Sequence, residues 1–300
     1  MTTSTLSSAL ETVRANTDYR VLTRISTPSP NATGRDIAET VCVAVIDLET
    51  TGMDSATDRV IEIAVVVCYV CRATGVIQRL VSEYSSLNDP GVPIPASATA
   101  VNGITDAMVM GQRMDLNALN ACLIGVDLVI AHNAAFDRPF AEILHRPFDE
   151  NSWACSFKEV DWSAEGIESR KLDYIAFKLG FFYDAHRALA DCHAVFAVLA
   201  TPLPKSQRAG FLQLFECMQQ PSYAFAALHA AYDKKDLLKT PGYAWNADKK
   251  NWHTSVTGKD IAKEELQWLA EYVYAGKSQA SIYKLTAKDR YSVRRGERIR

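Results

Sequence analysis

The sequence predicts an α/β domain built on a mixed, five-stranded sheet flanked by helices, with a smaller α+β region after it. Short apolar runs rich in β-branched residues recur through the first half of the chain, and their length suits buried strands. The first three runs follow one another directly, whereas the later ones alternate with segments of helical spacing. A hydrophobic share of 48% and a charged share of 22% support a sizeable core and exclude a disordered chain.

Three strands open the predicted domain. Residues 40–46 form a continuous apolar run, as expected of a strand covered on both faces. Residues 59–70 and 75–84 are two further strand-like segments, and the short turn between them predicts a hairpin. We therefore expect the first three strands to be antiparallel.

Helices and strands then alternate. A proline-punctuated loop at 93–103 separates the hairpin from this second half of the domain, and Pro202 with Pro204 ends it. The expected helices lie at 104–110, 115–124, 134–145, 172–179 and 188–199, and the expected strands at 127–132 and 153–157.

The predicted domain has a segment on each side, which gives three regions: residues 1–39, 40–203 and 204–300. Residues 1–39 are an N-terminal extension and linker, because Pro28, Pro30 and Gly34 interrupt any long element. The C-terminal region is expected to contain helices at 211–218, 224–231 and 260–273 and a strand–turn–strand unit at 242–256.

Composition also bears on location. No apolar run approaches the roughly 18 residues that span a bilayer, so no membrane association is expected. The first residues have neither a basic leader nor an apolar block, so no secretion signal is expected. The seven cysteines are odd in number and scattered, as reduced thiols of a cytoplasmic protein would be.

Four carboxylates occupy positions where acidic residues are unusual. Asp47 and Glu49 end the first strand, and two residues apart on a strand they point to one face. Two like charges at that distance repel unless a cation lies between them. Asp137 and Asp191 begin later helices, where each taken alone is better explained as a helix cap or a solvated acid. Taken together, the four suit hard divalent cations, Mg²⁺ or Mn²⁺.

The segments around these carboxylates resemble the DEDD superfamily of 3′–5′ exonucleases. DLETTG, HNAAFD and HRALAD match the three ordered motifs of the family, and the likeness covers residues 43–199. His186 lies five residues before Asp191, as in the histidine (DEDDh, DnaQ-like) branch, which includes the proofreading epsilon subunit of bacterial DNA polymerase III. Asn102 stands where the family often has a histidine. The resemblance implies a ribonuclease H-like fold.

The resemblance also implies a catalytic set. Asp47 should bridge two Mg²⁺ or Mn²⁺ ions, Glu49 and Asp191 should complete one ion site, and Asp137 should support the second. Two such ions stabilise the attacking and leaving oxygens of an in-line displacement at phosphorus. His186, with an ordinary pKa of about 6.5, is suited to accept the proton of the attacking water. The expected product is a nucleoside 5′-monophosphate.

Substrate contacts are expected beside the catalytic set. Thr50 and Thr51 should present backbone and hydroxyl groups to the terminal nucleotide, with Leu48, Asn133 and Phe136 nearby. Phe136 has helical spacing with Phe140, which favours core packing as the alternative.

Other reactive residue types have ordinary structural explanations. His132 fits a packed strand end better than a ligand, and His193 lies on a different helix face from Asp191. Cys68 and Cys71 have CxxC spacing but no second cysteine pair near them, so zinc is not expected.

The charge of the chain is uneven. From residue 234 onward there are 15 Lys and Arg against 8 Asp and Glu, a net of +7, within a chain whose total is −3. Trp245 and Trp252 stand among lysines there, so this region could stack bases and bind phosphates. The alternative is that the two tryptophans form the core of a small hairpin.

Three functions remain open at this level. The first is a metal-dependent 3′–5′ exonuclease acting on DNA ends, preferably single-stranded, either standalone or associated with a DNA polymerase. The second is an exoribonuclease that trims RNA ends, since the 2′-hydroxyl is read by pocket contacts that the motifs do not reveal. The third is a catalytically silent nucleic-acid-binding polymerase accessory. The complete set of carboxylates and His186 favours an enzyme, and TTG after Glu49 favours DNA.

Overall fold

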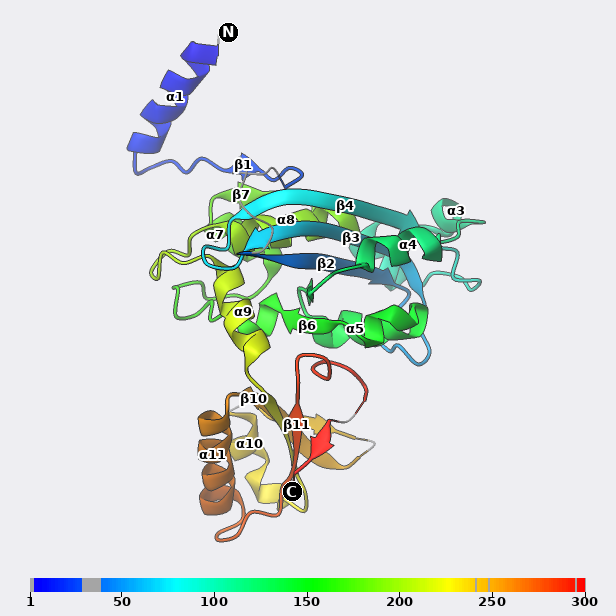
Figure 1. Ribbon diagram of the computed structural model, residues 1–300, viewed down its shortest axis with the longest axis vertical. Helices are drawn as coiled ribbons and strands as arrows, with labels where there is room; N and C mark the ends of the chain where they lie inside the picture. The colour runs from blue at the N-terminus through cyan, green and yellow to red at the C-terminus, as the bar shows by residue number, and fades with distance from the viewer. Residues whose placement is uncertain (1–2, 29–38, 241, 248, 295, 300) are drawn as a thin grey trace.

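The computed structural model describes residues 3–28, 39–240, 242–247, 249–294 and 296–299. It has a main lobe (residues 39–219), a C-terminal lobe (residues 220–299) and an N-terminal arm whose helix α1 (Thr3–Ala15) projects from the main lobe (Figure 1). The linker predicted around Pro30 and Gly34 lies at 29–38, outside the described residues. Within the described ranges, every helix is too short or too polar to cross a membrane.

A mixed five-stranded sheet forms the centre of the main lobe, which confirms the predicted fold class. Its strand order is β4-β3-β2-β5-β6. The first three strands are antiparallel, and β5 and β6 continue the sheet in parallel with β2. The carboxyl ends of β2, β5 and β6 therefore meet at one edge of the sheet. The strands are β2 (Thr40–Thr50), β3 (Val60–Cys71), β4 (Ile77–Leu87), β5 (Leu128–Ala131) and β6 (Ser152–Cys155).

Helices cover both faces of this sheet because its central strand is apolar on both sides. Val41, Val43 and Val45 of β2 pack with α8, α7 and α9, whereas Ala44 and Ile46 face α4 and α5. The bounds are α2 (Ala96–Asn102), α3 (Asp106–Val109), α4 (Leu116–Leu123), α5 (Ala134–Leu144), η2 (Arg146–Asp149), α6 (Ser156–Glu159), α7 (Leu172–Lys178), α8 (Ala188–Ala200) and α9 (Gly210–Gln219).

The N-terminal arm meets the main lobe through a short pairing. Strand β1 (Thr23–Arg24) lies parallel to β7 (Phe181–Phe182). Arg24 adds an ion pair to Asp184 and lies over the ring of Phe182. The arm thus contacts the segment that leads into α8.

The C-terminal lobe is an antiparallel five-stranded sheet, in the order β12-β11-β8-β10-β9, with helices packed on one face. The helix predicted over 224–231 is wrong. Alanine-rich sequence favours helix locally, but Tyr223, Phe225 and Ala227 alternate into the core with a period of two, as a strand requires. The elements are β8 (Ser222–Ala227), η3 (Tyr232–Lys234), α10 (Lys235–Lys239), β9 (Ala244–Asn246), β10 (Asn251–Thr257), α11 (Lys259–Trp268), η4 (Leu269–Val273), β11 (Ser281–Leu285) and β12 (Glu297–Arg298).

The predicted boundary after residue 203 assigns α9 to the C-terminal region, but the helix packs elsewhere. Phe211, Leu214 and Phe215 are buried in the same core cluster as β2 and α8. Phe211 packs against Phe196 of α8 in a tilted arrangement, with ring centroids 5.8 Å apart. The helix therefore completes the main lobe, and the division of the chain at 203 stays a prediction.

Residues 286–294, which we call the return segment, lead the chain back from β11 to the main lobe (Figure 1). The carbonyl of Ala287 accepts a hydrogen bond from the backbone amide of Trp153, on the edge strand β6. Arg138, whose surface is 0% exposed, donates to the carbonyls of Lys288 and Arg290 at 2.6 Å each. The return segment thus covers β6, which would otherwise be an open edge strand of the sheet.

A second buried cation completes the junction. Arg290 is 3% exposed, pairs with Glu159 of α6 and donates to the carbonyl of Cys217 at the end of α9. Tyr291 donates to the same Glu159 at 2.6 Å. Buried charges of this kind are stable only when paired and hydrogen-bonded, so the two lobes are held by an interlocking polar network.

Candidate active site

Two carboxylates project from the end of the central strand. Asp47 and Glu49 follow Val43 and Val45 on the face of β2 that is covered by α8. Both side chains are partly buried, because β3 lies alongside and pairs Asp47 with Ala64. The period of two along a strand therefore places two acids together at the margin of an apolar core, as the sequence predicts.

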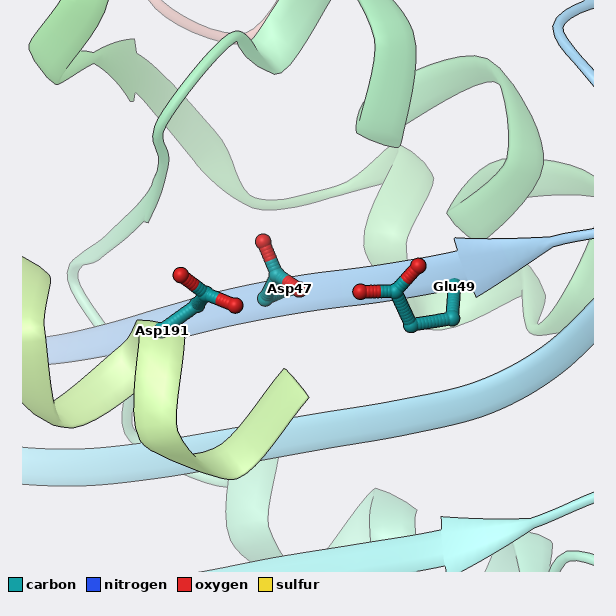
Figure 2. Close-up of side chains that lie close together, drawn as sticks. All are labelled: Asp47, Glu49 and Asp191. Carbon is teal, nitrogen blue, oxygen red and sulfur yellow. The ribbon is translucent and has the colours of Figure 1, made fainter. Parts of the chain in front are cut away.

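A third carboxylate meets them from a helix. Asp191 lies in the first turn of α8, and Figure 2 shows its side chain beside Asp47, with Glu49 farther along the same strand. One carboxylate oxygen from each of these three residues lies within 4.8 Å of the others. In the part of the chain that the structure describes, these three residues are the group of Asp, Glu, His or Cys side chains that lie close enough together to hold a metal ion.

The electrostatics of this group are those of crowded like charges. Burial, followed by the charges of Asp191 and Asp137, raises the pKa of Asp47 well above its ordinary value. Burial likewise raises the pKa of Glu49 to about 7. Ionised carboxylates are unfavourable here without a counter-charge, so the site attracts a proton or a cation.

Asp137 approaches from the other side of the sheet. It lies in the first turn of α5, directly after β5, and is 3% exposed. Asn133, between β5 and α5, has a left-handed φ of 104°, which allows the sharp turn between them. Burial raises the pKa of Asp137 well above its ordinary value, although backbone amides of Leu48 and of Asp137 itself oppose this. Asp137 is not among the three residues within 4.8 Å, but its charge acts on Asp47.

The segment before α8 fixes both oxygens of Asp191. The hydroxyl of Tyr183 donates to Oδ1 at 2.8 Å, and the backbone amide of His186 donates to Oδ2 at 2.9 Å. His186 has a left-handed φ of 67°, and its side chain is exposed. The backbone of His186 is thus tied to the acidic group while its imidazole stays open to solvent.

Three side chains that support this site lie outside the predicted set of site residues. Besides Tyr183, these are Asn102, which donates to Glu49 at 3.1 Å, and Glu62, which is 2% exposed. Glu62 accepts from Arg187 at 2.8 Å and from the backbone amide of Ala188 at 3.0 Å, at the start of α8. In the sequence, the feature that points to Glu62 is its place as a lone glutamate inside the apolar run of β3.

The predicted substrate-contacting residues are largely engaged within the protein. Thr51 is 6% exposed, and its hydroxyl accepts from the amide of Arg59. Thr50 is 8% exposed, and its hydroxyl donates to the carbonyl of Gly52. These bonds shape the turn after β2 beside Glu49, so the contact of this turn with substrate stays a prediction.

Leu48 and Phe136 face the core. The side chain of Leu48 is 4% exposed and belongs to the cluster beneath α5, whereas its neighbours Asp47 and Glu49 face α8. The ring of Phe136 lies 5.1 Å from that of Phe140 and packs against the same cluster. Phe136 is partly exposed, so its contact with a base also stays a prediction.

The histidines and cysteines for which the sequence predicts structural roles are hydrogen-bonded or buried. His132 contacts Ser156 and the carbonyl of Arg170 at 2.8 Å each, and burial lowers its pKa to about 4. His193 contacts Glu83 at 2.7 Å on the far side of α8. Cys68 and Cys71 are buried thiols that form no disulfide, and neither belongs to the group of possible metal ligands.

A mixed sheet with acidic side chains gathered at the end of its central strand defines the class of the main lobe as a ribonuclease H-like nuclease domain. The sequence profile of a family described as Exonuclease matches residues 44–199, more than half of the chain. The chain belongs to this exonuclease family, and the DnaQ-like 3′–5′ exonuclease resemblance of its motifs is confirmed.

Several known proteins are similar to the chain. DNA polymerase III PolC-type of Thermotoga maritima is 28% identical over 187 residues, which are 57% of this chain and 12% of that protein. The chain therefore spans a small part of such relatives. DNA polymerase III subunit epsilon of Aquifex aeolicus is 32% identical over 154 residues, 49% of this chain and 73% of the relative.

One solved structure shows the same kind of partial likeness. It is exonuclease X in complex with 5′ overhanging duplex DNA, which is 28% identical, with 57% of this chain and 99% of that chain covered at a TM-score of 0.41.

Proposed function

We propose that this protein is a divalent-metal-dependent 3′–5′ exonuclease that hydrolyses terminal phosphodiesters of DNA, preferably at single-stranded ends, and releases nucleoside 5′-monophosphates. The observation that carries the proposal is the approach of Asp47, Glu49 and Asp191 to within 4.8 Å of one another. Membership of the exonuclease family supports the hydrolysis of terminal phosphodiesters. The three clustered carboxylates support its dependence on divalent metal ions.

The residues present fit divalent cations. All four acids offer hard oxygen ligands, and burial has raised the pKa values of Asp47, Glu49 and Asp137 in the absence of a counter-charge. We propose that Asp47, Glu49 and Asp191 hold one Mg²⁺ or Mn²⁺ ion and that Asp47 and Asp137 support a second. When bound, a pair of such ions stabilises the attacking and leaving oxygens at phosphorus.

The chain itself orients the reacting groups. The imidazole of His186 is exposed beside Asp191, where it can accept the proton of an attacking water. Tyr183 holds Asp191, and Asn102 holds Glu49, so both carboxylates keep one orientation. Glu62 binds the start of α8 and thereby fixes the helix that carries Asp191.

Two substrate classes share this catalytic set. The similarity to DNA polymerase III components and the TTG turn after Glu49 support DNA. RNA is the alternative, and digestion of matched substrates decides between them. End-labelled single-stranded and double-stranded DNA and RNA would each be incubated with Mg²⁺, Mn²⁺ or a chelator.

We expect Asp47→Ala and His186→Ala to abolish digestion while circular dichroism and Tm stay close to those of the wild type. Glu150→Ala and His229→Ala, which change exposed residues away from the carboxylates, are matched controls and should digest normally. Full activity of either site variant would refute the assignment. Faster digestion of RNA than of DNA would move the proposal to the exoribonuclease, and a wild type inactive on all substrates would leave a silent binding protein.

A further inference from the structure

The hairpin β9–β10 of the C-terminal lobe exposes aromatic and basic side chains side by side. Trp245 on β9 is 51% exposed, although it is among the largest apolar residues of the chain. It pairs in register with Trp252 on β10, with ring centroids 5.5 Å apart. Lys249 and Lys250, both exposed, lie in the turn that joins the two strands.

Packing within the hairpin explains one tryptophan but not the other. Trp252 is partly buried against the cluster of Phe225 and Leu269 beneath α11. Trp245 is not part of that cluster, and β9 is the outer strand of its sheet. An indole half exposed on an edge strand offers a free ring face for stacking.

Cations lie in the turn of the hairpin and beside the face of β10 opposite the tryptophans. His253, on the opposite face of β10 from Trp252, is exposed. Burial, followed by the charges of Lys249 and Lys158, lowers the pKa of His253, so cations act on this strand from its own turn and from the main lobe. An anionic polymer is the ligand whose charge complements this group.

The hairpin is also held in a defined place relative to the carboxylates. Lys158 lies on α6, directly after β6, whose last residue Cys155 pairs with Ala131 at the end of β5. The carboxyl ends of β6, β5 and β2 share one edge, and neighbouring strands are about 4.8 Å apart. The return segment fixes the C-terminal lobe to this part of the main lobe through Arg138.

From these observations we infer that Trp245, Lys249 and Lys250 form a binding surface for single-stranded nucleic acid, separate from the carboxylate site. Trp245 stacks on a base, and the two lysines neutralise phosphates. The surface binds the strand at a distance from the end being hydrolysed, so it deepens the exonuclease proposal and rests on it. Binding at two places on one strand raises its affinity by effective concentration.

The test measures binding and hydrolysis separately on the full chain. Fluorescence anisotropy of a labelled oligo(dT) of sixteen nucleotides gives Kd across a series of salt concentrations. A chelator in the buffer prevents digestion. Hydrolysis of a thymidine dinucleotide, which is too short to reach the hairpin, reports on the carboxylate site alone. Variants are Trp245→Ala and the double variant Lys249→Ala/Lys250→Ala. Lys259→Ala/Lys277→Ala, which removes two exposed lysines of the same lobe, is the matched control.

We expect Trp245→Ala to raise Kd about 5-fold or more, the effect of losing one stacked base. The Lys249/Lys250 double variant should reduce the slope of log Kd against log salt by about 1.4, because each phosphate contact contributes about 0.7 for single strands. It keeps the tryptophan pair, so it remains informative if Trp245→Ala unfolds the hairpin. Dinucleotide hydrolysis should be unchanged in all variants.

Wild-type Kd and salt slope in both hairpin variants would overturn the inference. So would an equal loss of binding in the Lys259/Lys277 control, because the effect would then be one of overall charge. A wild type that does not hydrolyse the dinucleotide would instead count against the exonuclease proposal. Failure of that proposal and failure of the binding-surface inference are therefore distinguishable.

Discussion

Glu49→Gln should make the protein more stable when divalent cations are absent. Burial is the main reason that the pKa of Glu49 rises from 4.5 to about 7, and the charges of Asp191 and Glu62 add to it. The unfolded chain ionises first, so the folded state loses stability as the pH rises from 4.5 to about 7. At about 1.4 kcal/mol per pH unit the full difference is about 3 kcal/mol, which solvent screening of this partly exposed group reduces to about 2 kcal/mol.

Glutamine removes this penalty with little change of shape, because its side-chain oxygen can still accept the hydrogen bond of Asn102. Urea denaturation in a chelator at pH 5.5 and pH 8 measures the effect. The variant should exceed the wild type by about 2 kcal/mol at pH 8 and by about half of that at pH 5.5, where folded Glu49 is still protonated. Glu150→Gln, at an exposed position, should show no such pH dependence.

Mg²⁺ should reverse the order of stabilities. A ligand present at one hundred times its Kd stabilises a folded protein by about 2.7 kcal/mol, and the variant lacks one carboxylate for binding it. A variant less stable than the wild type in chelator at pH 8, or a difference that is the same at both pH values, would refute the reasoning.

Two further predictions concern residues around the site. Arg138→Ala removes the donor of the buried Arg290 carbonyl and the shortest bonds to Glu142 and the Lys288 carbonyl. Glu142 keeps Ser292 and a longer contact from Arg294, so the free energy of unfolding should fall by about 3 kcal/mol, the lower end for breaking a buried ion pair. Denaturation with the exposed Arg146→Ala as control checks this, and a loss below about 1 kcal/mol would contradict it. Tyr183→Phe removes the hydroxyl that donates to one oxygen of Asp191. The rate of hydrolysis at fixed Mg²⁺ should fall about tenfold, the equivalent of one hydrogen bond to a charged group, and a higher Mg²⁺ concentration should be needed for the half-maximal rate. An unchanged dependence of the rate on Mg²⁺ would show that Tyr183 does not position Asp191.

The parts of the fold that the sequence predicts are those set by local periodicity. Apolar runs at β2 and β3 have no competing interpretation, and alternation along β2 places Asp47 and Glu49 on one face. Strand β8 of the C-terminal lobe is different because it is short and half of its residues are alanine. Ala224 and its neighbours favour helix locally, and only pairing of β8 with β10 and β11, 25 or more residues away, decides for strand.

The supporting residues of the site follow the same division. Asp137 and Asp191 belong to recognisable motifs, and Tyr183 reaches Asp191 from eight positions earlier, whereas Asn102 and Glu62 act through contacts between distant segments. Glu62 meets Ala188 across 126 positions of chain, so only the packing of α8 on β3 brings them together. Patterns within one segment carry no information about such pairs.

The return segment has a consequence for how the molecule is made. Arg138 and Glu159 belong to the main lobe, but their partners at residues 288–291 emerge from the ribosome some 70 residues after α9. During translation the main lobe must exist for a time with Glu159 lacking Arg290, with Arg138 paired to Glu142 alone and with β6 uncovered. Its last step of folding therefore waits for the synthesis of the return segment, and a nascent chain halted within the C-terminal lobe would expose an open strand to its neighbours.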